Sequence, residues 1–210
     1  MTMIRALLSA TLLLTALPVA AQLQVQYSAK SLTISGATAR ADVVVIGIIH
    51  TNSKGFESIQ TPQSIEQTDA AGAVTVAVAR PSFRSVWLIV DLRSGEFIVS
   101  SPPGYAVRRM PVPADAIDRT GHSLLHSFPS ADLFIVRKGQ GAWHARASEG
   151  SSQDPRDARF NVSVDHFKPV GAAPPAPPVL TPNDIVMVFN APYMEFWATR
   201  LTPADLSGAK

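Results

Sequence analysis

The chain has 210 residues, of which 46% are hydrophobic and 16% are charged, and it contains no cysteine. A chain of this length can bury a core without covalent cross-links. The lack of cysteine excludes disulfides, thiolate metal sites and thiol catalysis, and a formal net charge of +2 is too small for a nucleic-acid-binding surface.

The first 21 residues have the pattern of a cleavable secretory signal. Arg5 precedes an apolar run from Ala6 to Leu17, and Val19-Ala20-Ala21 offers small residues to a signal peptidase. This run is shorter than the roughly 20 apolar residues that a permanent membrane anchor needs. We therefore expect residues 1–21 to be removed, so that Gln22 begins an exported protein, periplasmic or extracellular, without stable membrane insertion. An uncleaved anchor or a buried N-terminal helix is the alternative.

Short strand-like runs separated by Gly, Pro, Asp and Ser follow the leader. Ser31–Ser35 alternates apolar and polar residues and predicts a strand with one buried face. The run from Val43 to Ile49 is apolar almost throughout, which is typical of a strand buried on both faces. Gly47 within this run indicates a bulge or a close approach of another segment. Ala73–Ala79 alternates again and predicts a further half-buried strand.

Three pairs of apolar runs are each joined by a short polar connection and predict β-hairpins. Each first strand ends at a polar residue, and an aromatic residue follows six positions later. A duplicated β-unit would produce this shared spacing, but similar loops in unrelated hairpins would do so too, and we favour the latter because the likeness is confined to one turn. The expected strand pairs are Val86–Val90 with Phe97–Ser100, Leu133–Val136 with Ala142–Ala147, and Ile185–Phe189 with Glu195–Thr199.

Three segments are not strand-like. Pro111–Phe128 has a scattered apolar pattern and is expected to form a short helix or a long connection. Pro169–Pro182 contains Pro-Pro twice and predicts an extended strap across the surface, with a free linker as the alternative. Thr202–Lys210 is small and polar, so we expect a frayed end.

These elements together predict an all-β protein of the β-sandwich class. It forms either two sandwich-like halves that meet near residues 110–130 or one continuous larger sandwich. The expected organisation is a signal peptide at 1–21, a β-sandwich half at 22–112, a connection at 113–130, a second β-rich half at 131–203 with the Pro-rich strap at 169–182, and a disordered tail at 204–210.

The strand and turn patterns resemble the immunoglobulin-like and fibronectin-like modules of uncharacterised secreted bacterial proteins. The resemblance rests on Leu32–Thr38 followed by Asp42–Gly47, on Ser85–Asp91 with Ser94–Phe97, and on Gly139–Trp143. It implies an immunoglobulin-like sandwich in which Trp87 fills the core as the buried tryptophan of such domains does. It brings no catalytic or binding residues with it, and the cysteine pair of antibody-type domains is missing.

A metal site is one candidate for chemistry. Asp118, His122 and His126 are spaced four apart, so on a helix they would share one face and supply three zinc ligands. Gly121 and the flanking prolines argue against a helix, and no zinc-hydrolase signature is present. The other reading is a surface cluster of polar residues without a metal.

The tryptophans are the other candidate. Trp87, Trp143 and Trp197 fall in or beside the three expected hairpins. Exposed in a row, they would stack on sugars or hold a partner protein. Buried, they would fill the core, as aromatic residues on alternating strands usually do.

No motif in the sequence points to catalysis. Nucleophile-elbow, phosphate-loop and dinucleotide-binding patterns are all missing, so we assign no catalytic residue and expect no cofactor. The sequence therefore predicts an exported, non-enzymatic binding or structural module whose partner is an envelope protein or a carbohydrate, and not a nucleic acid. The alternative is a secreted metal-dependent hydrolase that uses Asp118, His122 and His126.

Overall fold

The computed structural model describes residues 22–53, 56–78, 84–105, 107–118, 121–126, 131–147, 151–154, 159–175, 179–190 and 193–206. At 51–53, 56–58, 125–126, 151–154 and 159–160 it describes the backbone alone. The expected signal peptide at 1–21 lies outside the described residues. No helix in the described part of the chain is long and apolar enough to span a membrane.

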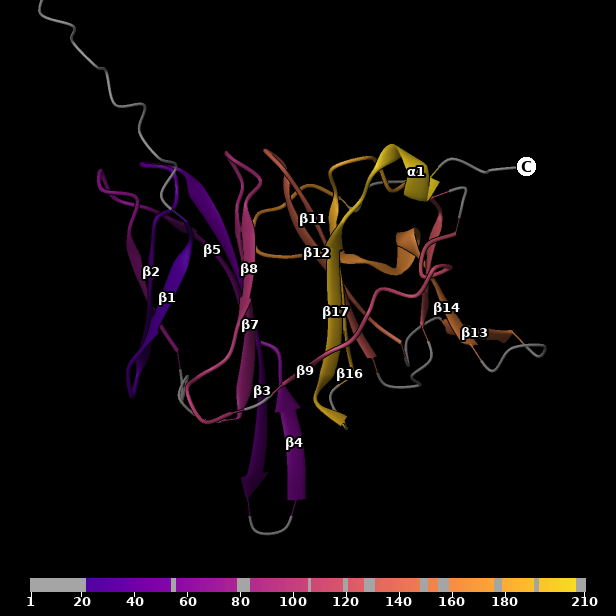
Figure 1. The fold of residues 1–210 in the computed structure, drawn as a ribbon, viewed down its shortest axis with the longest axis horizontal. Coiled ribbons are helices and arrows are strands. Elements are labelled where there is room, and N and C mark those ends of the chain that lie inside the picture. Colours follow the sequence, from indigo (N-terminus) through magenta and orange to yellow (C-terminus); the bar gives the residue numbers. More distant parts are fainter. Residues whose placement is uncertain are drawn as a thin grey trace, which may run out of the picture.

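The chain folds into four β-sheets that lie side by side across the molecule (Figure 1). Sheets A and B come from the first half of the chain, and sheets C and D come from the second half. Sheet A contains β1 (Gln24–Tyr27), β2 (Ser31–Ser35) and β6 (Val74–Ala77), and sheet B contains β3 (Asp42–Ser53), β4 (Phe56–Gln60), β5 (Gln63–Gln67), β7 (Ser85–Asp91) and β8 (Phe97–Ser100). Sheet C contains β9 (Arg108–Arg109), β11 (Ala131–Arg137), β12 (Gly141–Arg146), β15 (Lys168–Pro169), β16 (Ile185–Asn190) and β17 (Glu195–Arg200), and sheet D contains β10 (Ser123–His126), β13 (Ser151–Asp154) and β14 (Arg159–Ser163).

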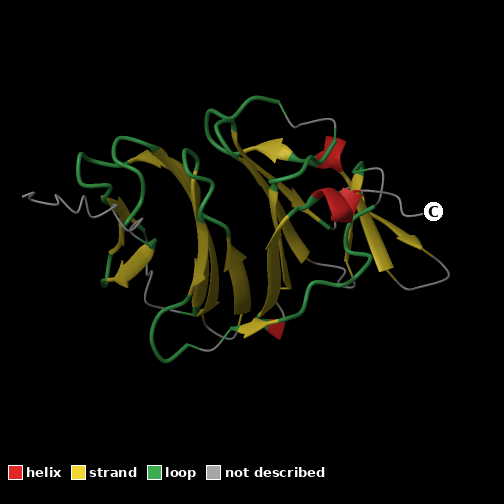
Figure 2. Cartoon of the chain, turned by 45° about the horizontal axis from the view of Figure 1, so that its top comes forward, coloured by secondary structure: helices red, strands yellow, loops and turns green. Residues whose placement is uncertain are grey.

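Three hydrophobic cores separate the four sheets, so the stack has the order A, B, C, D. The all-β, sandwich-like fold expected from the sequence is therefore confirmed. Sheets A and B form one sandwich, sheets C and D form another, and the inner sheets B and C pack against each other. The helical elements whose bounds the structure describes are short: η1 (Val164–His166) and α1 (Pro203–Leu206) (Figure 2).

The inner strands are apolar on both faces because both faces are buried. Successive side chains of a strand point to opposite sides of its sheet. In β3, Val43 and Val45 face sheet A, whereas Val44 and Ile46 face sheet C. The continuous apolar run in the sequence therefore predicted a central strand correctly.

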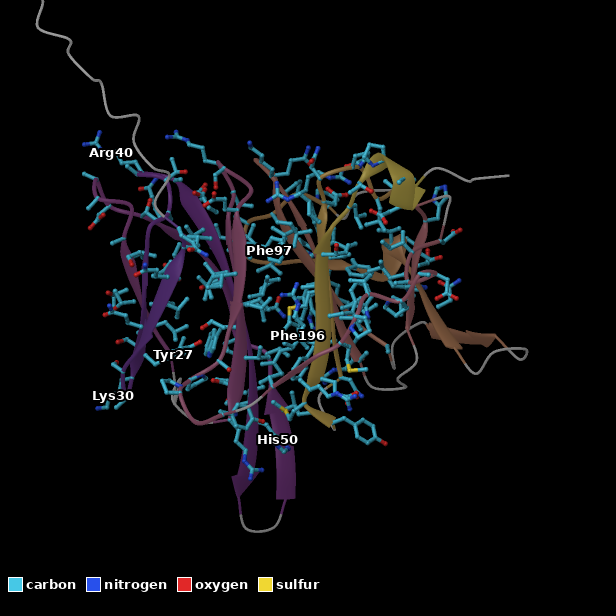
Figure 3. All side chains as sticks on the ribbon, in the orientation of Figure 1. Tyr27, Lys30, Arg40, His50, Phe97 and Phe196 are labelled. Carbon is cyan, nitrogen blue, oxygen red and sulfur yellow. The ribbon has the colours of Figure 1, made fainter. Side chains whose placement is uncertain are left out.

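Sheet C repeats this arrangement and completes the central core. In β11, Phe134 faces sheet B and Ile135 faces sheet D. Phe97 and Phe196, at the starts of β8 and β17, both pack in the central core (Figure 3). The buried members of this core are Val44, Ile46, Ile48, Val86, Leu88, Val90, Leu92, Phe134, Val136, Ala142, Val170, Ile185, Met187, Phe189, Phe196 and Ala198.

The two sandwiches follow the same chain path. In each sandwich, a strand of the outer sheet is followed by the central strand of the inner sheet, and a further strand then pairs with one side of this central strand. The chain next returns to the outer sheet and pairs with the first strand. Finally it forms a hairpin whose first strand pairs with the other side of the central strand. The corresponding strands are β2 and β10, β3 and β11, β5 and β12, β6 and β14, β7 and β16, and β8 and β17.

All three expected hairpins are formed, but only two of them are equivalent. Phe97 pairs with Val90, and Phe196 pairs with Phe189 at the same point of the second sandwich. The hairpin of β11 and β12 has a different register, because Arg137 pairs with Gly141. The two sandwiches therefore share a strand order that extends beyond one turn, and the middle hairpin matches the other two in sequence spacing but not in register.

The segment expected to form a short helix or a long connection contains a strand instead. Within Pro111–Phe128, Ser123–His126 form β10 of sheet D, although this range was assigned to the connection between the halves. Gly121 has a φ of +72°, and its carbonyl accepts a hydrogen bond from the amide of Leu180. This left-handed glycine, joined to the Pro-rich strap, is incompatible with a continuous helix through the segment.

The Pro-rich strap packs on the second sandwich where it is described. Lys168 and Pro169 pair with the edge of β12, and Leu180 is buried between sheets C and D. Residues 204–206 were assigned to the disordered tail, but they belong to α1. The Asp205 carboxylate accepts hydrogen bonds from the amide and hydroxyl of Thr202, which closes this turn.

The contact between Gly47 and Trp87 gives a stability prediction. Gly47 pairs with Trp87 across β3 and β7, and a Cβ at Gly47 would overlap the indole ring. We expect Gly47→Ala to lower the free energy of unfolding by about 1–3 kcal/mol, the usual cost of overpacking, as measured by urea denaturation. In a Trp87→Phe background the same substitution should cost clearly less, because the smaller ring leaves room for the methyl group. An equal cost in both backgrounds would show that the indole does not fill this space.

Candidate functional site

The three tryptophans do not form a binding surface. Trp87 and Trp143 have no exposed area, and Trp197 is 4% exposed. The indole N–H of Trp87 donates to the Ser85 hydroxyl at 2.9 Å, and that of Trp143 donates to the Pro174 carbonyl at 2.8 Å. The hypothesis that they stack on a sugar or a partner is therefore wrong, because these rings fill the two outer cores.

The residues proposed for zinc do not lie on a helix. His126 lies at the end of β10, and an extended chain separates residues four apart by roughly 13 Å. His122 is exposed, and the Ser123 hydroxyl donates to the Asp118 carboxylate at 3.4 Å. The side chain of His126 lies outside the described residues. Among the side chains that are described, no group of three or more His, Asp or Glu residues is arranged to hold a metal ion.

A half-buried histidine joins the two sandwiches. His144 of β12 stacks on Phe134, with ring centroids 4.7 Å apart. Its Nε2 lies 2.8 Å from the Asp132 carboxylate, and its Nδ1 lies 2.9 Å from the Gln63 amide nitrogen on β5. When the Gln63 amide donates to Nδ1, the neutral ring donates its own proton to Asp132. Both ring nitrogens are thus occupied, which suits a structural link better than a catalytic base.

Outside this network, a cleft with a volume of about 650 Å³ lies between the sandwiches. We call it the cationic cleft. It lies where β3 begins and where β5, β7 and β11 end, so both sandwiches contribute to its walls. The first sandwich contributes Arg40, Ala41, Asp42, Ile65, Gln67, Leu92 and Arg93, and the second contributes Lys138, Gly139, Gln140, Gly171, Ala172 and Ala173.

Positive charge dominates this cleft. Arg40, Arg93 and Lys138 are exposed and line it, and Asp42 is the one carboxylate among its lining residues. The three cations come from three separate turns, and Lys138 comes from the opposite sandwich. Glycine and alanine supply much of the remaining wall, which leaves backbone groups accessible. This arrangement can bind an anionic group by charge and by hydrogen bonds.

The turns that carry the two arginines are fixed by one buried carboxylate. Asp91 accepts hydrogen bonds from the amide and hydroxyl of Thr38 at 2.7 and 2.6 Å, and from the amides of Arg93 and Ser94 at 2.8 and 3.2 Å. Burial by itself would raise the pKa of Asp91, but the hydrogen bonds from Thr38, Ser94 and Arg93 outweigh it and hold this pKa below 3.8. The carboxylate therefore stays ionised and joins the turn before β3 to the hairpin after β7.

A second hollow lies at the other end of β5. It has a volume of about 240 Å³ and is lined by Thr61, His144, Ala145, Arg146, His166 and Lys168. We call it the side pocket. It also carries an excess of basic groups, although Arg146 lies 3.3 Å from the Asp132 carboxylate and is partly neutralised by it.

Sequence reasoning did not find the cationic cleft. The three turns that build it were all recognised as turns, and each carries a basic residue: Arg40, Arg93 and Lys138. Nothing in the sequence places these turns at one end of two packed sheets, because that depends on the contact between the sandwiches. Comparison with known proteins adds no further guide, since no protein-family model and no curated protein sequence matches the chain.

The Asp91 network makes the stability of the cleft walls dependent on pH. Because the folded-state pKa of Asp91 is depressed, its stabilisation is fully present above an ordinary aspartate pKa and is lost as the pH falls through the folded-state value. We expect Asp91→Asn to lower the free energy of unfolding at pH 7 by about 1–3 kcal/mol, since the buried N–H donors lose a charged acceptor.

Thermal unfolding of both proteins between pH 7 and pH 2.5 measures this effect. The difference between Asp91→Asn and the unsubstituted protein should shrink as the pH drops below about 4. Glu96→Gln, an exposed carboxylate in the same hairpin, is the matched control and should have little effect. A difference that stays constant down to pH 2.5 would contradict the assignment of an ionised Asp91.

Proposed function

We propose that this chain is an exported binding module that holds an anionic ligand in the cationic cleft. The observation that carries the proposal is that Arg93 of the first sandwich and Lys138 of the second line one hollow of about 650 Å³. The net charge of the whole chain is only +2. Such a local concentration of cations therefore has to come from the way the sandwiches pack.

The composition of the cleft supports binding rather than catalysis. Among its described lining residues there is no histidine, serine, threonine or tyrosine, and Asp42 is the one carboxylate. Among the described lining residues, only Asp42 and Lys138 are of the types that serve as acid, base or nucleophile. Binding of an anion needs only cations and N–H donors that are held in place.

The expected location and partners agree with this function. The signal-like N-terminus supports export to the periplasm or beyond the cell. A partner in the cell envelope, either an acidic carbohydrate or an acidic segment of a protein, would supply the negative charge. The resemblance to immunoglobulin-like modules of secreted bacterial proteins supports the same class of role, in which a sandwich presents its end loops to a ligand.

A small polyvalent anion tests the cleft directly. We expect citrate, titrated into isotopically labelled protein, to shift the amide NMR signals of Asp42, Gln67 and Gly139, which line the cleft. The double variant Arg93→Ala/Lys138→Ala should bind citrate about 5- to 30-fold more weakly, as expected for the loss of two ion pairs worth about 0.5–1 kcal/mol each.

The matched control is Lys30→Ala/Arg108→Ala, which removes the same charge elsewhere. Both side chains are exposed, and Lys30 lies at the end of the first sandwich opposite Arg40 (Figure 3). This control should bind citrate as the unsubstituted protein does. Equal weakening in both double variants, or shifts spread evenly over the surface, would show that only the net charge attracts the anion.

A further inference from the structure

Strand β5 has an unpaired edge that runs beside the cationic cleft. It pairs with β3 along one side, and no strand in the described part of the chain pairs with its other side. Unpaired edges of this kind accept extended peptides as additional strands. The four strand residues from Gln63 to Glu66 are half-buried and Gln67 is exposed, so this edge is open to a ligand.

The hydrogen-bond pattern identifies which backbone groups point outward. The Gly47 amide donates to the Pro62 carbonyl, and the Thr68 amide donates to the Ala41 carbonyl. Even-numbered residues from 62 to 68 thus turn their backbone groups toward β3, and the alternation of an antiparallel ladder turns those of Gln63, Ile65 and Gln67 away from it. These three residues present amides and carbonyls over about 13 Å of the edge.

Basic residues lie at both ends of this edge. Ile65 and Gln67 line the cationic cleft together with Arg93 and Lys138. Thr61, two residues before β5, lines the side pocket, next to Arg146, His166 and Lys168. A ligand that lies along β5 would therefore extend from the basic residues of the cleft to those of the side pocket. Two carboxylates lie near this edge. Asp42 lines the cleft. Glu66 does not, because side chains alternate along a strand and its side chain points to the face opposite Ile65 and Gln67.

From this juxtaposition we propose that the ligand is an extended acidic peptide that adds to β5 as a further strand of sheet B, an inference that rests on the proposed anion-binding function. Its main chain pairs with Gln63, Ile65 and Gln67, and its carboxylates contact the cations of the cleft and the side pocket. An acidic polysaccharide offers no alternating amides and carbonyls to match this edge. Neither hollow has a Phe, Tyr or Trp among its described lining residues on which a sugar would stack.

The probe is a blocked heptapeptide in which Glu alternates with Val, and its affinity is measured by titration calorimetry. In an added strand, every second amide of the peptide donates toward β5 and the others point away from it. N-methylation of the amides that donate toward β5 should weaken binding at least 10-fold. N-methylation of the amides that point away should have a much smaller effect. A Lys–Val heptapeptide should not bind measurably, because it carries the wrong charge.

The protein side is tested by Gln63→Pro, with Gln63→Ala as its control. Proline removes one outward amide and no hydrogen bond of the β3–β5 ladder, so it is tolerated at the start of an edge strand. Both substitutions remove the side-chain hydrogen bond to His144, so the difference between them reports the amide alone. Gln63→Pro should weaken heptapeptide binding several-fold relative to Gln63→Ala. Citrate should bind both variants equally, because Gln63 does not line the cleft, and this separates the edge from the cleft.

Each outcome decides between the proposals. Citrate binding in the cleft together with a heptapeptide insensitive to N-methylation would overturn the strand-addition proposal and leave the anion-binding function standing. An oligogalacturonate of equal charge that binds more tightly than the heptapeptide would also overturn it, in favour of an acidic carbohydrate. If neither citrate nor the heptapeptide binds, both proposals fail.

Discussion

The packing of sheet B against sheet C is the contact on which the rest of the structure depends. Each sheet has an apolar face that a two-layer sandwich would leave in water, and packing sheet B against sheet C buries both faces in one core. Large aromatic side chains, Phe134 and Phe189, fill this layer without exposed area. Truncating one such ring typically costs about 3–5 kcal/mol, so the contact is large enough to hold the two sandwiches as one body.

The candidate site is a consequence of this contact. Packing of two sheets of similar topology brings the turns at one end of each sandwich together, and the cationic cleft forms between them. The buried carboxylate of Asp91 fixes the turns of Arg40 and Arg93, and the Gln63–His144–Asp132 hydrogen bonds fix β5 against β12. Charge and an unpaired strand edge are thus held on rigid supports, which lowers the entropic cost of binding a flexible ligand.

Much of the fold could be predicted from the sequence, because it follows from local periodicity. The apolar run of β3 indicated burial on both faces, and the three hairpins were recognised from their turns. Gly47 indicated a bulge or a close approach of another segment, and the structure shows the close approach to be that of Trp87. The equivalence of the two sandwiches was missed because it resides in strand order and not in residue identity. The helix considered around His122 was wrong because a left-handed Gly121 and the strap at Leu180 impose an extended path. The cleft could not be predicted from the sequence, because Arg93 and Lys138 are brought to one hollow only by the packing of two sheets that are distant in the sequence.

Hydrogen exchange of the unsubstituted protein tests the central claim most directly. If sheets B and C share one core, the slowest amides of β3 and β7 and those of β11 and β16 should exchange only through global unfolding. Both groups should then show the same opening free energy and the same dependence on urea. A markedly lower opening free energy and a weaker urea dependence in one sandwich would show that it unfolds alone, and would contradict a structure built on the contact between the two.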